Sequence, residues 1–250
     1  MKKSPLRSLA QLIFMAFLGL LQSSHAANLA FDDASSAVYA DGNGWANGDN
    51  GGSGFASWSI TTVGSAGVFV GSTAVSAQSF GLWANSGANS STARRDFTGG
   101  SLLAGQTISF SIAHTPTVST GAEVGFSLLS AGSSRITFKF VGGGTSWQMN
   151  DGNADFGAGQ NYLASSPISF SFTYNGGNSY SYRLGTGSGN NYTSTSNISS
   201  LDGIVFRNNG QGNSQNLGID DLQIVPEPSS ASLLAFALSS LLALRRRRKV

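Results

Sequence analysis

Few residues in the central part of the chain could perform acid–base or nucleophilic chemistry. His114 is the only histidine after residue 26, and Glu123 is the only glutamate before residue 227. A serine–histidine–aspartate triad would need His114, but no Gly-x-Ser-x-Gly turn lies beside it. Its place at a strand end, just before Thr115-Pro116, instead predicts a histidine in a turn.

Glycoside hydrolysis needs two positioned carboxyl groups, one of them kept protonated. Asp151 and Asp155 are close enough in sequence to be considered, but the Asn-Asp-Gly-Asn segment around Asp151 is typical of a turn. The chain has no cysteine, which excludes a cysteine nucleophile, a thiol switch and cysteine-ligated metal sites. We therefore expect no catalytic residue and no enzymatic activity.

Two tryptophans and two aspartates point to possible binding sites. Trp45 and Trp147 lie among glycine and asparagine residues, where an exposed ring could stack on a sugar; the alternative is that such rings fill the core. Asp41 and Asp49 could offer oxygen ligands to calcium, but their spacing does not match an EF-hand loop. Turn formation is the favoured role for these aspartates, and no cofactor is expected.

The net charge of +2 conceals an acidic central region. Eight of the fourteen basic residues lie in the two terminal segments, so residues 27–244 carry six basic and twelve acidic residues, a balance of 6 − 12 = −6. Nucleic-acid binding depends on clustered lysine and arginine, so nucleic acid is not an expected partner.

Both ends of the chain have the composition of sorting segments. Residues 1–26 combine a basic start, an apolar run and Ser24-His25-Ala26, which predicts a signal peptide cut by signal peptidase between Ala26 and Ala27. At the other end, residues 231–244 are apolar enough for a short transmembrane helix, and residues 245–249 are all basic. Prolines before this run predict that the last strand ends at Val225. This charge arrangement places the domain outside and the tail at the cytoplasmic surface.

The C-terminal segment, residues 226–250, resembles the PEP-CTERM sorting signal of Gram-negative envelope proteins. The resemblance rests on a proline–glutamate–proline motif, an apolar helix and an arginine cluster in that order: Val225, Pro226, Glu227, Pro228, Arg245, Arg246, Arg247 and Arg248. It implies recognition by an exosortase, transient anchoring in the inner membrane, and release or re-attachment at the cell surface.

Strict alternation of apolar and polar residues predicts an all-β domain over residues 27–225. The pattern is clearest in residues 107–113, 124–128, 136–140, 168–174 and 180–184, and no sustained helical period interrupts it. Shorter apolar segments are expected as strands at 55–62, 67–70, 80–83, 92–97, 204–207 and 217–225, with an exposed edge at 94–96. Together these segments predict an antiparallel β-sandwich or jelly roll.

The ending Leu217-Gly-Ile-Asp-Asp-Leu-Gln-Ile resembles the last strand of lectin-like jelly rolls. That resemblance implies that Asp220 or Asp221 faces a calcium ion, while a solvated strand edge is the favoured alternative. The function expected from the whole sequence is a non-enzymatic exported protein of the cell surface or extracellular matrix, processed by an exosortase and associated with exopolysaccharide or biofilm. The alternative is a lectin-like carbohydrate-binding module.

Overall fold

The computed structural model describes residues 29–115, 117–152, 154–185, 191–210 and 215–226. This part of the chain forms fifteen β-strands and one short 3-10 helix, η1 (Ala37–Ala40). The strands are β1 (Ala30–Asp32), β2 (Ser59–Val63), β3 (Ala66–Gly71), β4 (Ser79–Ala84), β5 (Ser90–Asp96), β6 (Thr107–Thr115), β7 (Glu123–Ser130), β8 (Ser133–Val141), β9 (Ser146–Asn150), β10 (Phe156–Asn161), β11 (Ile168–Gly176), β12 (Ser179–Leu184), β13 (Asn191–Thr193), β14 (Gly203–Asn209) and β15 (Asn216–Val225).

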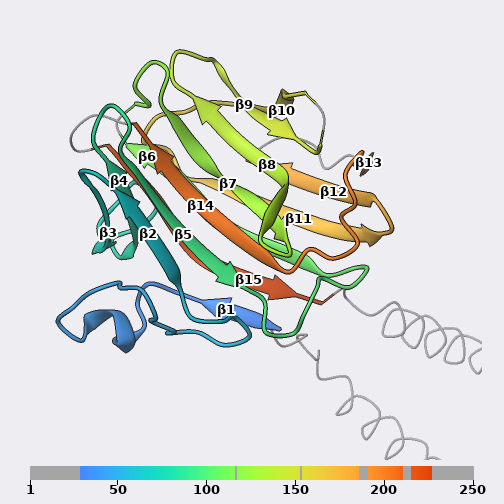
Figure 1. The fold of residues 1–250 in the computed structure, drawn as a ribbon, viewed down its shortest axis with the longest axis horizontal. Helices are drawn as coiled ribbons and strands as arrows, with labels where there is room; N and C mark the ends of the chain where they lie inside the picture. The colour runs from blue at the N-terminus through green and yellow to red at the C-terminus, as the bar shows by residue number, and fades with distance from the viewer. Residues whose placement is uncertain (1–28, 116, 153, 186–190, 211–214, 227–250) are drawn as a thin grey trace, which may run out of the picture.

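The strands form two antiparallel sheets that pack face to face as a β-sandwich (Figure 1). The first sheet has eight strands in the order β13-β12-β11-β6-β15-β4-β3, with β1 added beside β15. The second has seven strands in the order β10-β9-β8-β7-β14-β5-β2. The predicted all-β sandwich is therefore confirmed.

Phenylalanines at alternate positions join the two sheets. Phe110 and Phe170 from the eight-stranded sheet meet Phe126, Phe138 and Phe206 from the seven-stranded sheet, with ring centroids 4.6–5.0 Å apart in the closest pairs. All five rings are buried. Each edge-to-face pair adds about 0.5–1.5 kcal/mol beyond the burial of apolar area, so the residues with strict alternation in sequence hold the sheets together.

Three strands and one helical turn differ from the prediction. β10 and β13 lie in segments rich in glycine and asparagine, where no apolar alternation marks a strand, and β9 alternates over only five residues, Ser146 to Asn150. Phe31 and Val38-Tyr39 are the apolar residues that could mark a first short strand; Phe31 is the centre of β1, whereas Val38 and Tyr39 lie in η1. These elements depend on pairing with neighbours already in the sheet, which local sequence does not record.

The last strand ends at Val225, as predicted, and half-buried Pro226 follows it. The predicted signal peptide and its cleavage site lie outside the described residues, as does the tail from Glu227 onward. Within the described ranges, no helix reaches the length and apolarity needed to span a bilayer.

The outward faces of the two sheets differ in chemistry. On the seven-stranded sheet, ion pairs join Arg94 to Asp96 (2.8 Å) and Lys139 to Asp155 (2.7 Å). On the eight-stranded sheet, hydroxyl side chains of neighbouring strands form hydrogen bonds, such as the one between Thr107 of β6 and Thr173 of β11 at 2.7 Å. Polar groups of the charged face are therefore the ones best placed to make charge-assisted contacts with a ligand.

Candidate functional site

Trp45 and Trp147, the two rings expected to stack on sugars, are both in the core. Their exposed fractions are 3% and 2%. Trp45 packs edge-on against Trp58 at 4.8 Å because the loop before β2 folds back over the core. Trp147 points inward because it alternates with polar neighbours in β9 and packs near Phe140. The prediction of exposed stacking rings was wrong.

The aspartates considered for calcium act chiefly on the backbone around them. Asp41 accepts a bond from the Asn43 amide (3.2 Å), and Asp49 accepts one from the Ala46 amide (2.7 Å), which supports the turn interpretation. Asp220 is buried and accepts the Ser76 hydroxyl at 2.8 Å, and Asp221 follows it on the exposed side with φ of 57°. In the part of the chain that the structure describes, no three acidic or histidine side chains gather as a metal site.

The pair Asp151 and Asp155 does not act together either. The buried Asp151 carboxylate accepts a hydrogen bond from the Tyr180 hydroxyl at 2.9 Å. Asp151 lies at the predicted turn, and Asp151 and Asp155 both follow the end of β9. Asp155 is bonded by Lys139 and Asn150, and these hydrogen bonds lower its pKa. Each carboxyl group thus holds a separate part of the chain.

Arg95 and Asp32 form an ion pair that is fully buried. Arg95 was expected on an exposed edge, but it shares the inward face of β5 with Ala93, and both charged side chains have 0% exposure. Asp32 also accepts bonds from the Tyr39 hydroxyl (2.8 Å) and the Trp58 indole (2.9 Å). The guanidinium lies 4.7 Å from the Trp58 ring centroid. Burial raises the pKa of Asp32, and Arg95, Tyr39, Trp58 and the Asp33 backbone amide oppose that shift. This cluster fastens the N-terminal segment to the core.

His114 is a core residue and not the predicted turn residue. It lies inside β6, 1% exposed, with Nδ1 3.2 Å from the Tyr162 hydroxyl and no hydrogen-bond partner for Nε2 among the described residues. Burial lowers the pKa of His114 from 6.5 to about 4. The imidazole is therefore neutral at pH 7.

Folding stability is expected to fall with acid because of His114. The unfolded chain takes up a proton near pH 6.5 and the folded chain only near pH 4, so stability is complete above pH 6.5 and is lost as the pH falls toward 4. The loss amounts to about 1.4 kcal/mol per pH unit and about 3 kcal/mol in all. Urea denaturation from pH 7 to pH 4 measures it, with His114→Leu as the non-titrating comparison. Equal slopes for both proteins would contradict this assignment.

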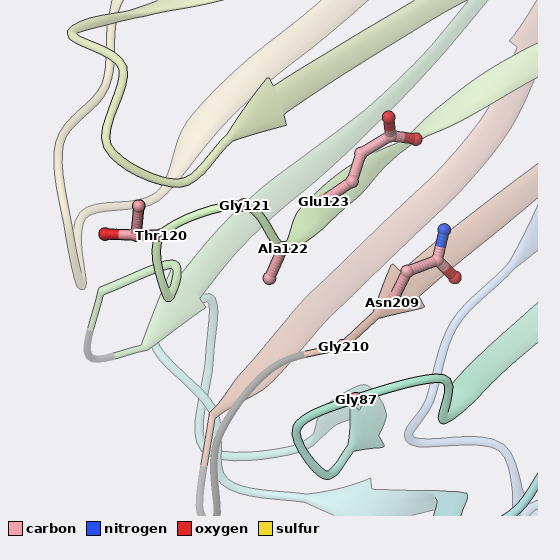
Figure 2. A pocket seen from close by; sticks show the side chains of 7 residues that line it. All are labelled: Gly87, Thr120, Gly121, Ala122, Glu123, Asn209 and Gly210. Atoms are coloured by element: carbon pink, nitrogen blue, oxygen red, sulfur yellow. The ribbon is translucent and has the colours of Figure 1, made fainter.

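A hollow of about 470 Å³ opens where β7 begins and β14 ends (Figure 2). The hollow is more open than enclosed, so a ligand there would keep one side in contact with water. Figure 2 shows the side chains of Glu123 and Asn209 next to each other on two adjacent strands. The lining residues are Gly87, Thr120, Gly121, Ala122, Glu123, Asn209 and Gly210.

The loops around this hollow are held by backbone contacts. The Gly210 amide bonds the Asn89 carbonyl at 2.9 Å, and the Ala122 amide bonds the Ser119 carbonyl at the same distance. A Cβ added to Gly142, just after β8, would lie 1.8 Å from the Ser119 carbonyl oxygen. Only glycine at this position therefore permits the loop before β7 to lie against the end of β8. The polar groups of the hollow therefore stand on a fixed frame.

Glu123 carries the charge of the hollow. Its carboxylate lies 3.6 Å from Arg207 Nη1 and 3.8 Å from Lys139 Nζ, and its side chain is 26% exposed. Both distances exceed hydrogen-bond length, and the described residues give this carboxylate no hydrogen bond. Its oxygens can therefore accept hydrogen bonds from a ligand, and the two cations lie within 4 Å of the carboxylate.

The chemistry of this set suits a polyhydroxylated neutral molecule. A carboxylate accepts two hydroxyl groups, an amide both donates and accepts, and the Thr120 hydroxyl does the same. At Gly87 and Gly121 an added Cβ would meet nothing within 4 Å, so the backbone there is open to a ligand.

Sequence reasoning did not find the hollow. Glu123 and Asn209 are 86 residues apart and become register partners only when β7 pairs with β14. The single signal in the sequence was that Glu123 is the only glutamate of the central region.

Comparisons with known proteins identify relatives in fold alone. No protein-family model and no curated protein matches the chain. A solved structure named "Sialidase" is similar with a TM-score of 0.58 and 12% identity, over 82% of this chain and 19% of the other. A structure titled for endo-acting O-glycanases of human gut bacteria in mucin breakdown has a TM-score of 0.53 and 9% identity, over 79% and 98%. This chain thus spans about a fifth of the sialidase. Both likenesses support the β-sandwich assignment.

Proposed function

We propose that the β-sandwich is a lectin-like module that binds carbohydrate in the hollow beside Glu123, and that it does so without catalysing a reaction. The observation that carries the proposal is the pairing of Glu123 and Asn209 across two strands above an open glycine backbone. The two solved structures described above have names that refer to sialidase and O-glycanase activity, and this is consistent with a carbohydrate ligand here. The proposal depends on the geometry and not on those names.

Glu123→Gln is expected to weaken glycan binding by about 10- to 100-fold, because a hydrogen bond to a charged acceptor contributes about 1.5–3 kcal/mol. The substitution keeps the shape of the side chain and removes its charge. Binding to the exopolysaccharide of the producing cell, sheared to oligosaccharides, would be measured by calorimetry or on a glycan array.

Asp155→Asn is the matched control for that experiment. Asp155 also pairs with Lys139 on the same face of the sheet, at 2.7 Å, but does not line the hollow. Its variant should bind as the wild type does. Equal affinity of the Glu123→Gln variant and the wild type would contradict the proposed site.

We also propose that the protein is exported and that its tail is processed by an exosortase, which places the module at the cell surface or in an exopolysaccharide matrix. The end of β15 at Val225 supports this, since a cut after Pro226 would leave every described strand intact. Terminal mass spectrometry of the exported protein should find residues 245–250 absent. A mature form that keeps Arg245 to Val250 would count against processing.

A further inference from the structure

β3 is an edge strand without the features that normally prevent edge-to-edge association. In the described part of the chain it pairs with β4 on one side and with no strand on the other. Figure 1 places it at the margin of the sandwich. Residues 65–73 read Ser-Ala-Gly-Val-Phe-Val-Gly-Ser-Thr, without a charge or a proline, and the pairing with β4 contains no bulge. Proteins usually protect edge strands with charges, prolines or bulges, so an edge strand without them indicates an interaction surface.

The strands at the other three ends of the two strand orders are each protected, and β1 is bridged to Ser53 through Phe31. The Ile60 amide of β2 donates to the Asn47 side chain at 2.9 Å. β13 has only three residues, and the pairing of β10 is interrupted by an irregular register between Gly157 and Asn161. The contrast makes β3 the edge that is open to another strand.

The hydrogen-bonding groups on the free side of β3 can be assigned from its neighbour. The Asn85 amide donates to the Ser65 carbonyl at 2.9 Å, so Ser65 faces β4. Antiparallel bonding alternates from residue to residue, so Phe69 also faces β4, while the amides and carbonyls of Val68 and Val70 point outward.

The sequence of β3 is the same in both directions about Phe69: Gly67-Val68-Phe69-Val70-Gly71. A two-fold axis through Phe69 would pair each valine with a valine and each glycine with a glycine of a second copy. Val68 and Val70 would then exchange backbone bonds, which matches the outward groups assigned above. Symmetric homodimers require a self-complementary surface of this kind.

The side chains of β3 leave this approach open. The Phe69 ring lies over Gly81 of β4, where an added Cβ would be 2.3 Å from the ring, and Trp83 lies over Gly67 in the same way. The Phe69 ring therefore lies back over β4 and not across the free edge of β3, and the Trp83 ring covers one face of β3.

We propose that this chain forms a two-fold homodimer by antiparallel pairing of β3 with β3 of a second copy, joining the two eight-stranded sheets. The proposal is independent of carbohydrate binding. The dimer places Phe69 opposite Phe69 of the second copy in a non-hydrogen-bonded pair, with Cα atoms about 4.5 Å apart. That separation suits a disulfide.

Cysteine cross-linking in the full chain tests the register, because the chain has no cysteine of its own. Phe69→Cys should shift, under oxidation, from the mass of one chain to that of two. Leu103→Cys, at a residue 66% exposed, should remain single. Val70→Cys should cross-link much less than Phe69→Cys, because residue 70 would oppose residue 68. Association through the terminal segments would not favour position 69.

A charge on the edge gives a second test. Phe69→Lys, at a side chain that does not pack against the core, should convert the dimer to a monomer in sedimentation experiments with an unchanged circular dichroism spectrum, while Thr62→Lys on β2 should remain a dimer. Monomeric wild-type protein across a concentration series would overturn the proposal, as would a Phe69→Cys variant that cross-links no more than Leu103→Cys.

Discussion

Replacing Arg95 with methionine is expected to lower the free energy of unfolding by about 3–5 kcal/mol, because it leaves a buried carboxylate without its cation. Arg95 and Asp32 are both fully buried, and the guanidinium also bonds the Ala56 carbonyl and Asn50. Methionine fills part of the volume but supplies no donor. The effect is large beside a typical total stability of about 5–15 kcal/mol.

Arg94→Met is the control for this measurement. Arg94 is the neighbour of Arg95 on the opposite, solvent-facing side of β5, and its ion pair with Asp96 is partly exposed. Such a pair contributes at most about 1 kcal/mol. Urea denaturation of both variants at pH 7 gives the comparison, and equal losses would show that the buried pair does not fasten the N-terminal segment.

Trp147→Ala is expected to destabilise the fold by about 3–5 kcal/mol, which is the usual cost of removing a buried large aromatic residue. Trp147 is 2% exposed between the sheets, so its loss leaves a cavity and not a vacant sugar platform. Leu163→Ala, at a residue 54% exposed, should change stability by about 0.5 kcal/mol or less. Thermal unfolding measures both.

A Trp147→Ala variant as stable as the wild type would contradict the burial of Trp147, and the residue would again be a candidate ligand contact. If the variant instead unfolds at lower temperature, reduced glycan binding by it would say nothing about a stacking role.

Alternation along the chain was enough to predict the strands that form the core. β6, β7, β8, β11 and β12 all appear where apolar residues recur at every second position. Their sequences determine which face is buried, because a shift by one residue would expose the whole apolar set. This local information suffices for the fold class.

The errors arose where burial depends on residues far away in sequence. Arg95 is buried because Asp32, 63 residues earlier, lies against the same inward face of β5. Trp45 is surrounded in sequence by glycine and asparagine, but its loop folds over Phe80. Composition within a short segment predicts turns well and does not predict which side of a turn is covered.

The candidate site depends on distant residues in the same way. Glu123 and Asn209 gain a possible role only because β7 and β14 are neighbours, and the order of strands in a sheet is not encoded in any one segment. The two sorting segments, in contrast, have features that are contiguous in sequence, so sequence alone is enough to predict them. They lie outside the described residues and stay a prediction.

Hydrogen–deuterium exchange of the full chain, with and without oligosaccharides from the producing cell's exopolysaccharide, tests carbohydrate binding in the hollow most directly. Bound glycan should slow exchange of the backbone amides at Thr120 to Glu123 and at Asn209 and Gly210, which line the hollow. Protection confined to other parts of the sandwich, or none at saturating oligosaccharide, would contradict the proposed site.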